Sequence, residues 1–114
     1  MIFGESHVGI ADSYNDLATI SRRLKKYDDA IQYHKKALEI RKRIYGEKHS
    51  SVAISLNNIA YVYESAKNYK KAIEYYLKAI EIEKSISREP QSSIIMSYKN
   101  LARTYERLGK MKKL

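Results

Sequence analysis

The chain has 114 residues and a formal net charge of +9, from 22 Lys and Arg against 13 Asp and Glu. It has no cysteine, four glycines and one proline, which excludes a disulfide framework, a thiolate metal site and a turn-rich all-β fold. The apolar fraction of 44% is too high for a disordered chain, and no run approaches the roughly eighteen apolar residues of a membrane span. The first residues also lack the pattern of a signal peptide, so we expect a helical, cytoplasmic protein.

A motif near the start of the chain recurs 42 residues later, as Gly4-Glu5-Ser6-His7 and then Gly46-Glu47-Lys48-His49. Of the 42 aligned pairs between residues 4–45 and 46–87, 18 are identical. A third copy begins near Arg88, because Asn58-Ile59-Ala60 reappears as Asn100-Leu101-Ala102. We therefore predict a single domain with repeat 1 at about 4–45, repeat 2 at about 46–87 and a partial repeat 3 at about 88–114.

Each copy is predicted to form two amphipathic helices, since its apolar residues recur every three or four positions. In the first copy these residues are Ile10, Tyr14, Leu17, Ala18 and Leu24, and then Ala30, Ile31, Ala37, Leu38 and Ile44. In chain order the predicted breaks fall at Lys25-Lys26, Gly46–His49, Lys67-Asn68, Arg88–Pro90 and Leu108-Gly109. Gly46 suits a left-handed residue after a helix, and Ser50 or Ser51 is expected to cap the next one.

Small residues recur at fixed places in the predicted helices. Ala18, Ala30 and Ala37 each return 42 residues later, at places where only a small side chain lets two helices approach closely. The large residues Tyr14, Leu17 and Tyr27 are expected to fill the space around these alanines. Short turns make the paired helices antiparallel, and the stacking of units buries apolar surface that a single pair of helices would leave exposed. The sequence thus predicts an all-α, right-handed solenoid of about five helices.

At these positions the sequence resembles tetratricopeptide repeat (TPR) proteins. The matching pairs are Leu17-Ala18, Ile59-Ala60 and Leu101-Ala102, and the matching small residues of the second helices are Ala30 and Ala72. The 42-residue period and the Gly-x-x-His motif resemble the kinesin light chain-like subclass. This resemblance implies a right-handed TPR superhelix that acts as a protein–protein interaction scaffold. In such scaffolds a peptide or a partner helix lies in the concave groove formed by the first helices.

The resemblance also implies which side chains line that groove. They are Asn15, Asp16, Thr19, Arg22, Ile54, Asn57, Asn58, Tyr61, Met96, Lys99, Asn100, Arg103 and Arg107. Asn58 and Asn100 hold a place whose carboxamide binds the ligand backbone in family members. Tyr61, with Ile54 and Met96, is expected to form an apolar floor or else to pack against a neighbouring helix. The basic residues Arg22, Arg23, Lys99, Arg103 and Arg107 either bind an acidic peptide or are solvated helix ends.

Catalytic and metal-binding functions are not expected. His7, His34 and His49 have no metal-ligand spacing on one helix, so we predict no metal site and no cofactor. There is no phosphate-binding glycine loop, and the acidic residues are expected on helix exteriors rather than paired in a cleft. The chain is therefore not expected to be an enzyme.

Three alternatives remain open. A basic surface could bind nucleic acid through Lys25, Lys26, Lys35, Lys36, Arg41, Lys42, Arg43, Lys70 and Lys71. Both ends of the chain align with the middle of a unit, so we expect a fragment of a longer array or a small protein that pairs with another copy. The helix at residues 92–108 has no partner on one face and is expected to allow end-to-end self-association.

Overall fold

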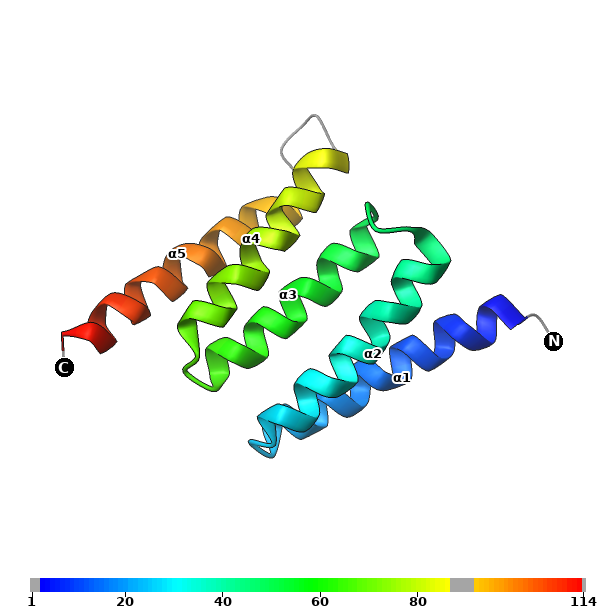
Figure 1. Ribbon diagram of the computed structural model, residues 1–114, viewed down its shortest axis with the longest axis horizontal. Coiled ribbons are helices and arrows are strands. Elements are labelled where there is room, and N and C mark those ends of the chain that lie inside the picture. The colour runs from blue at the N-terminus through cyan, green and yellow to red at the C-terminus, as the bar shows by residue number, and fades with distance from the viewer. Residues whose placement is uncertain (1–2, 87–91, 114) are drawn as a thin grey trace.

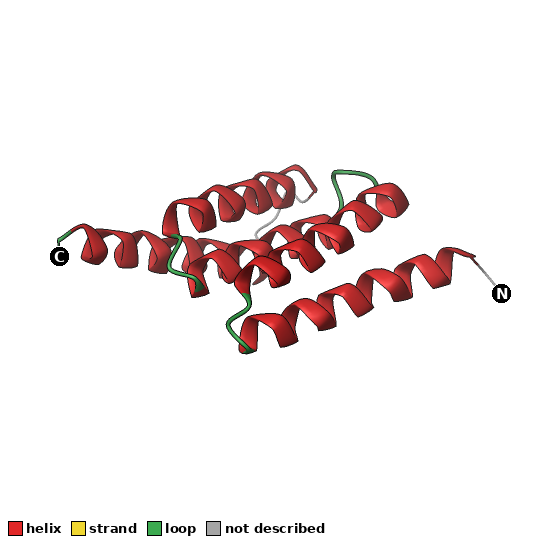
Figure 2. Ribbon diagram, turned by 60° about the horizontal axis from the view of Figure 1, so that its bottom comes forward, coloured by secondary structure: helices red, strands yellow, loops and turns green. Residues whose placement is uncertain are grey.

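The computed structural model describes residues 3–86 and 92–113, and within these ranges all regular structure is helical. The five helices are α1 (Phe3–Arg23), α2 (Tyr27–Tyr45), α3 (Ser50–Ser65), α4 (Tyr69–Ile86) and α5 (Ser92–Lys112). Figure 2 shows short loops between α1 and α2, between α2 and α3, and between α3 and α4. The predicted all-α class with five helices is confirmed.

Each helix packs against the next one along the chain. In Figure 1, α2 crosses in front of α1, α4 crosses in front of α5, and α3 lies between these two pairs. The molecule measures 55 × 38 × 17 Å, and the shortest dimension fits two layers of helices. Among the described helices, only α3 packs extensively against the second helices of two successive units, α2 and α4.

The predicted close approach at alanine is confirmed. None of the six alanines at the repeated places has exposed surface: Ala18, Ala30, Ala37, Ala60, Ala72 and Ala79. Tyrosines fill the space beside them, with the rings of Tyr63 and Tyr75 stacked at 5.6 Å and those of Tyr14 and Tyr33 at 6.1 Å. The core is therefore built from small residues at the crossings and large rings around them.

The predicted apolar face of α1 is only partly buried. Leu17 is 43% exposed, whereas Ile59, at the same place in the second repeat, is completely buried. Ile59 lies in a helix that packs against both α2 and α4, but α1 packs extensively only against α2. Ile10, Ile20 and Leu24 are exposed on α1 for the same reason. At the other end of the stack, Tyr98, Ala102 and Tyr105 are exposed on α5.

The breaks predicted at Lys25-Lys26 and Lys67-Asn68 are confirmed, and both turns have the same geometry. Lys25 and Lys67 adopt positive φ angles of 62° and 64°. After α1, the amide of Lys26 donates to the carbonyl of Ser21 at 2.8 Å, and the amide of Lys25 donates to that of Arg22 at 2.9 Å. This pattern is a Schellman motif, which satisfies the last carbonyls of the helix.

The predicted break at Leu108-Gly109 is wrong, because helix α5 continues through these residues to Lys112. The first copy of the Gly-x-x-His motif, Gly4–His7, lies inside α1, whereas the second copy precedes α3 as a loop. In the described residues no second helix follows α5 and none precedes α1, so no packing forces the chain to turn at these places. The break predicted at Arg88–Pro90 lies outside the described residues.

The loop between the first two units is confirmed, but its cap differs from the prediction. Gly46 has a φ of 86°, and its amide donates to the carbonyl of Lys42 at 2.9 Å. Ser50 and Ser51 are already helical, and His49 is the N-cap of α3, since its Nδ1 accepts from the amide of Ser51 at 3.0 Å. The His49 ring also stacks on Tyr45 at 4.3 Å. This histidine therefore has a structural role.

Replacing Lys25 or Lys67 with glycine is expected to stabilise the protein. Each lysine occupies a left-handed conformation that costs a side-chain-bearing residue about 1 kcal/mol and that glycine adopts freely. Urea denaturation of Lys25→Gly and Lys67→Gly should show an increase of about 1 kcal/mol in the free energy of unfolding. Lys36→Gly, in the middle of α2, is the matched control and should lose a similar amount. Loss of stability in all three variants would contradict the strain at the two turns.

Candidate functional site

The three first helices, α1, α3 and α5, are linked to one another by side chains on one side of the molecule. The guanidinium of Arg22 on α1 lies 4.8 Å from the ring centroid of Tyr61 on α3. Asn57 on α3 donates from Nδ2 to Oγ of Ser97 on α5 at 3.0 Å. We call the surface of these three helices the first-helix face.

The predicted groove residues differ in their exposure on this face. Ile54, Tyr61 and Met96 are about half exposed, and Asp16 and Lys99 are also exposed. Thr19, Arg22, Asn58 and Asn100 are partly buried. Thr19 donates its hydroxyl hydrogen to the carbonyl of Asn15 within α1 at 3.0 Å. The apolar and carboxamide side chains predicted for the groove thus remain accessible, and their role in binding stays a prediction.

Glu64, near the end of α3, binds groups from two other helices although it is only 2% exposed. Arg103 on α5 donates to both carboxylate oxygens, from Nε at 2.7 Å and from Nη2 at 2.8 Å. Arg107 on α5 reaches Oε2, and the Tyr76 hydroxyl on α4 donates to Oε1 at 2.9 Å. Both oxygens of this buried charge are therefore satisfied, as a buried carboxylate requires.

The electrostatics of this cluster favour its charged form. Burial alone would raise the pKa of Glu64, but hydrogen bonds from Arg103 and Tyr76 and the charges of Arg103 and Arg107 outweigh burial and lower this pKa. Burial and the bond to Glu64 raise the pKa of Tyr76 far above its ordinary value. Glu64 thus stays ionised and links α3, α4 and α5.

This cluster corrects the expectation that acidic side chains lie on helix exteriors, since Glu64 and Glu83 are both buried. It also changes the setting of two predicted groove residues. Arg103 and Arg107 are only partly exposed and bind Glu64 within the chain. Their predicted contact with an acidic peptide stays a prediction, and it would have to share these guanidinium groups with Glu64.

Asn15 belongs to a second polar cluster, between the first and second units. With its amide NH2 toward His34 and its oxygen toward Arg41, it donates to Nδ1 of His34 at 2.9 Å and accepts from Nη1 of Arg41 at 3.2 Å. Arg41 on α2 also donates to Oγ of Ser55 on α3 at 2.9 Å. Burial, and then the charges of Arg41 and Arg22, lower the pKa of His34 to about 4. His34 is therefore neutral near pH 7.

The same cluster recurs between the second and third units with the charge reversed. Glu83 lies 42 residues after Arg41, and its Oε1 accepts from Ser97 at 2.8 Å and lies 3.5 Å from Nδ2 of Asn57. Among the described residues, no donor reaches Oε2 of Glu83 or Oδ1 of Asn57, although both acceptors are buried. Asn57, predicted to line the groove, thus contributes to packing between units.

The sequence contained a signal for these clusters. Each place in one unit meets a fixed place in the next, so Arg22 with Tyr61 and Glu64 with Arg103 are equivalent pairs. A search for opposite charges 39 residues apart would have found Glu64 with Arg103. A helical wheel of a single helix does not reveal the burial of Glu64 and Glu83, because these side chains are enclosed by the neighbouring helices.

No metal centre is evident. Among the residues that the structure describes, no group of three or more His, Asp or Glu side chains is placed to hold a metal ion. His34 and His49 have the roles given above, and the side chain of His7 lies outside the described part. In the same described ranges, no helix is both long and apolar enough to cross a membrane.

The family-model comparison identifies a tetratricopeptide repeat at residues 5–85. This match covers more than half of the chain, so the protein belongs to the tetratricopeptide repeat family. A comparison with curated proteins found no match.

Solved structures with the same fold agree with this assignment. BtubC (BKLC) from P. vanneervenii superposes with a TM-score of 0.79 at 28% identity, over 90% of this chain and 41% of that chain. Two structures of kinesin light chain TPR-like repeats from Podosopora anserina give TM-scores of 0.76 and 0.74, each at 21% identity, over 93% and 89% of this chain. The predicted TPR solenoid of the kinesin light chain-like type is confirmed. The chain spans half or less of the length of these three structures.

The low pKa of His34 predicts a loss of stability in mild acid. The unfolded chain takes up a proton at this histidine near its ordinary pKa of 6.5, but the folded chain does so only near about 4. The free energy of unfolding should therefore fall by about 2 kcal/mol between about pH 7.5 and about pH 5. In His34→Gln, which has no proton to take up, this dependence should disappear in urea titrations at each pH. Glu64 does not change the free energy of unfolding in this pH range, because its lowered pKa affects stability only below its ordinary value of 4.5. Parallel curves for both proteins would contradict the prediction.

Proposed function

We infer that this chain, as a TPR protein, acts as a protein-interaction scaffold. We propose that its ligand is a peptide or a partner helix that binds across the first-helix face. The observation that supports this best is the accessible row formed by Ile54, Tyr61 and Met96, on helices whose spacing is fixed by buried contacts. Large apolar side chains that are half exposed on a rigid surface are typical anchors of an interface. We propose no catalytic role for the chain.

The polar side chains of this face fit a peptide ligand. Asn58 and Asn100 are partly exposed carboxamides, each able to donate to and accept from a peptide backbone. Lys99 is exposed and forms no ion pair with any described residue, so it is available to an acidic side chain of the ligand. The Arg22 guanidinium, stacked on Tyr61, also lies on this face.

The test uses an array of synthetic peptides of about 15 residues, with graded acidic content, followed by fluorescence anisotropy on the peptides that bind. Asn58→Ala and Lys99→Glu should each weaken binding about tenfold, and the effect of Lys99→Glu should shrink at high salt. Arg103→Glu is unsuitable, because it would also place two carboxylates together at the buried Glu64.

Lys70→Glu, on α4 and away from this face, is the matched control and should leave the affinity unchanged. Equal affinities for the unmodified protein, Asn58→Ala and Lys99→Glu would contradict binding on the first-helix face.

We also propose that the chain acts as part of a longer array, as its span of half or less of similar structures suggests.

A second candidate function is self-association through the ends of the stack. It is favoured by the apolar face of α5, where Tyr98 is 43% and Tyr105 is 50% exposed. The equivalent residues of α3, Leu56 and Tyr63, are buried or half-buried against α4. Contiguous exposed apolar surface of this kind promotes association.

Sedimentation velocity over a range of concentrations tests this candidate. The unmodified chain should form dimers or longer assemblies, and Tyr98→Glu with Tyr105→Glu should restore the monomer, because two charges cannot be buried in an apolar contact. The pair Lys36→Gln and Lys70→Gln, which also lowers the net charge by two, serves as a control for charge alone. A monomer at all concentrations would contradict self-association.

Nucleic-acid binding gains no specific support. Of the basic residues predicted for it, Arg41 is largely buried and donates to Ser55 and Asn15. Lys35 and Lys42 line a groove that also contains carboxylates, which would repel phosphate groups.

A further inference from the structure

A groove of about 750 Å³ lies on the opposite side of the molecule from the first-helix face, between the second helices α2 and α4. Both helices pack against α3, which forms the floor. The apolar lining comes from all three helices and consists of Leu38, Val52, Leu56, Tyr75 and Ile82. Tyr75 and Ile82 are half-buried and therefore accessible from the groove, whereas Val52 is completely covered. The volume lies within the range of ordinary ligand-binding clefts.

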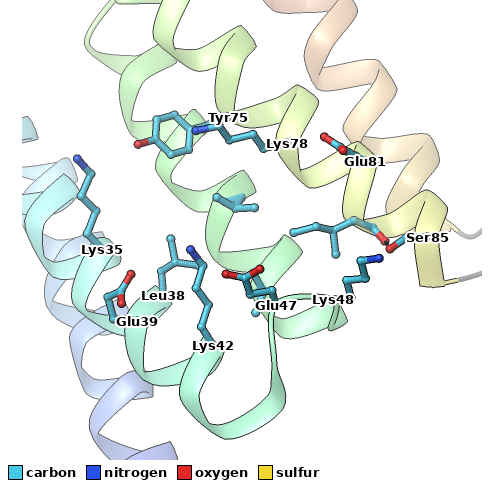
Figure 3. Close-up of a pocket in the computed structure, with 13 residues that line it drawn as sticks. Lys35, Leu38, Glu39, Lys42, Glu47, Lys48, Tyr75, Lys78, Glu81 and Ser85 are labelled. Atoms are coloured by element: carbon cyan, nitrogen blue, oxygen red, sulfur yellow. Dashed lines mark hydrogen bonds between the residues drawn. The ribbon is translucent and has the colours of Figure 1, made fainter.

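Charged side chains of both signs surround this apolar lining. Figure 3 shows Lys35, Glu39 and Lys42 rising from α2, opposite Lys78 and Glu81 on α4. Glu47 and Lys48 follow from the loop at the end of α2. Along the α2 wall the charge therefore alternates from positive to negative and back to positive.

Most of these rim charges form no ion pair with another described residue. In the described residues, ion pairs join Glu74 with Lys71 and Lys78, Glu106 with Lys110, Asp12 with Arg41, and Glu64 with its arginines. None of these pairs includes Lys35, Glu39, Lys42, Glu47, Lys48 or Glu81. Because carboxylates alternate with ammonium groups, the rim complements a polypeptide with both signs of charge rather than a polyanion.

The backbone around the groove favours a helical ligand. The helices that form its walls satisfy their own amide and carbonyl groups, so an extended peptide would find no strand edge to pair with. A helix satisfies its own backbone and needs only side-chain contacts. The wall from Tyr75 to Ser85 on α4 has room for about three helical turns, roughly 15 Å.

We propose that this groove between α2 and α4 binds an amphipathic helix of a partner protein. The apolar stripe of the bound helix lies on Tyr75 and Ile82. Charged residues flank this stripe: the acidic ones contact Lys35 and Lys42, and the basic ones contact Glu39 and Glu81. The protein would then bind one partner on each side, since none of the residues that line this groove is among the predicted ligand-binding residues of the first-helix face.

The experiment uses a displayed library of helical peptides of about 14 residues, with a leucine stripe flanked by randomised Glu and Lys. Selected peptides are measured by fluorescence anisotropy against the whole chain. The double variant Lys42→Glu with Glu81→Lys keeps the net charge and should weaken binding at least about tenfold. A peptide with its acidic and basic residues exchanged should bind this variant better than it binds the unmodified protein. This rescue would not follow from a change in fold alone.

The matched control is Lys70→Glu with Glu106→Lys, which also keeps the net charge but lies outside the groove. It should bind the selected peptides with unchanged affinity, and amide shifts on binding should centre on Leu38, Tyr75 and Ile82. Failure of the library to yield a peptide that binds better than about 1 mM would overturn the proposal. So would peptides that are insensitive to the rim exchange but weakened by Lys99→Glu, a result that would support the first-helix face instead. Preferential binding of an RNA oligonucleotide to the rim would overturn it as well.

Discussion

Pairs of helices in this protein pack closely at buried alanines: Ala18 lies with Ala30 in one core cluster, Ala60 with Ala72 in a second and Ala53 with Ala79 in a third. A larger residue at any of these places would push two helix backbones apart. Because these close contacts fix the spacing of the helices, they also fix which side chains of successive units face each other. The polar clusters, the first-helix face and the groove between α2 and α4 all depend on this spacing.

Each junction between units carries a polar contact at the same place but with different chemistry. At the first junction, Arg41 donates to Ser55. At the second, Glu83 accepts from Ser97, and Asn57 lies beside both. The geometry of the contact is thus set by the backbone, and its charge by the residue at one place of the repeat. A buried charge needs hydrogen-bond partners, so each junction requires its own set of polar side chains.

The repeated apolar positions were sufficient to predict the fold, because a core place recurs wherever the backbone recurs. They predicted two turns at Lys25 and Lys67 and the crossings at alanine. They failed for Leu17, whose burial requires a neighbouring helix that the described chain lacks there. They failed for Gly109 because a turn at this residue also requires such a helix. The Glu64 cluster was missed for a different reason: it joins three helices, and a pattern within one helix does not contain such a contact.

Equivalent places with opposite charges make the order of the units specific. Arg22 stacks on Tyr61 between the first two units, whereas Glu64, at the same place one unit later, binds Arg103. If the first two units were exchanged, Arg22 would face Arg103 and Glu64 would face Thr19, so one junction would hold like charges and the other would leave a buried carboxylate without its cation. Each unit therefore fits only one successor, and the surface formed by the helices acquires a fixed sequence of apolar and charged groups. A repeat protein needs such a fixed surface in order to recognise one ligand rather than any peptide of similar composition.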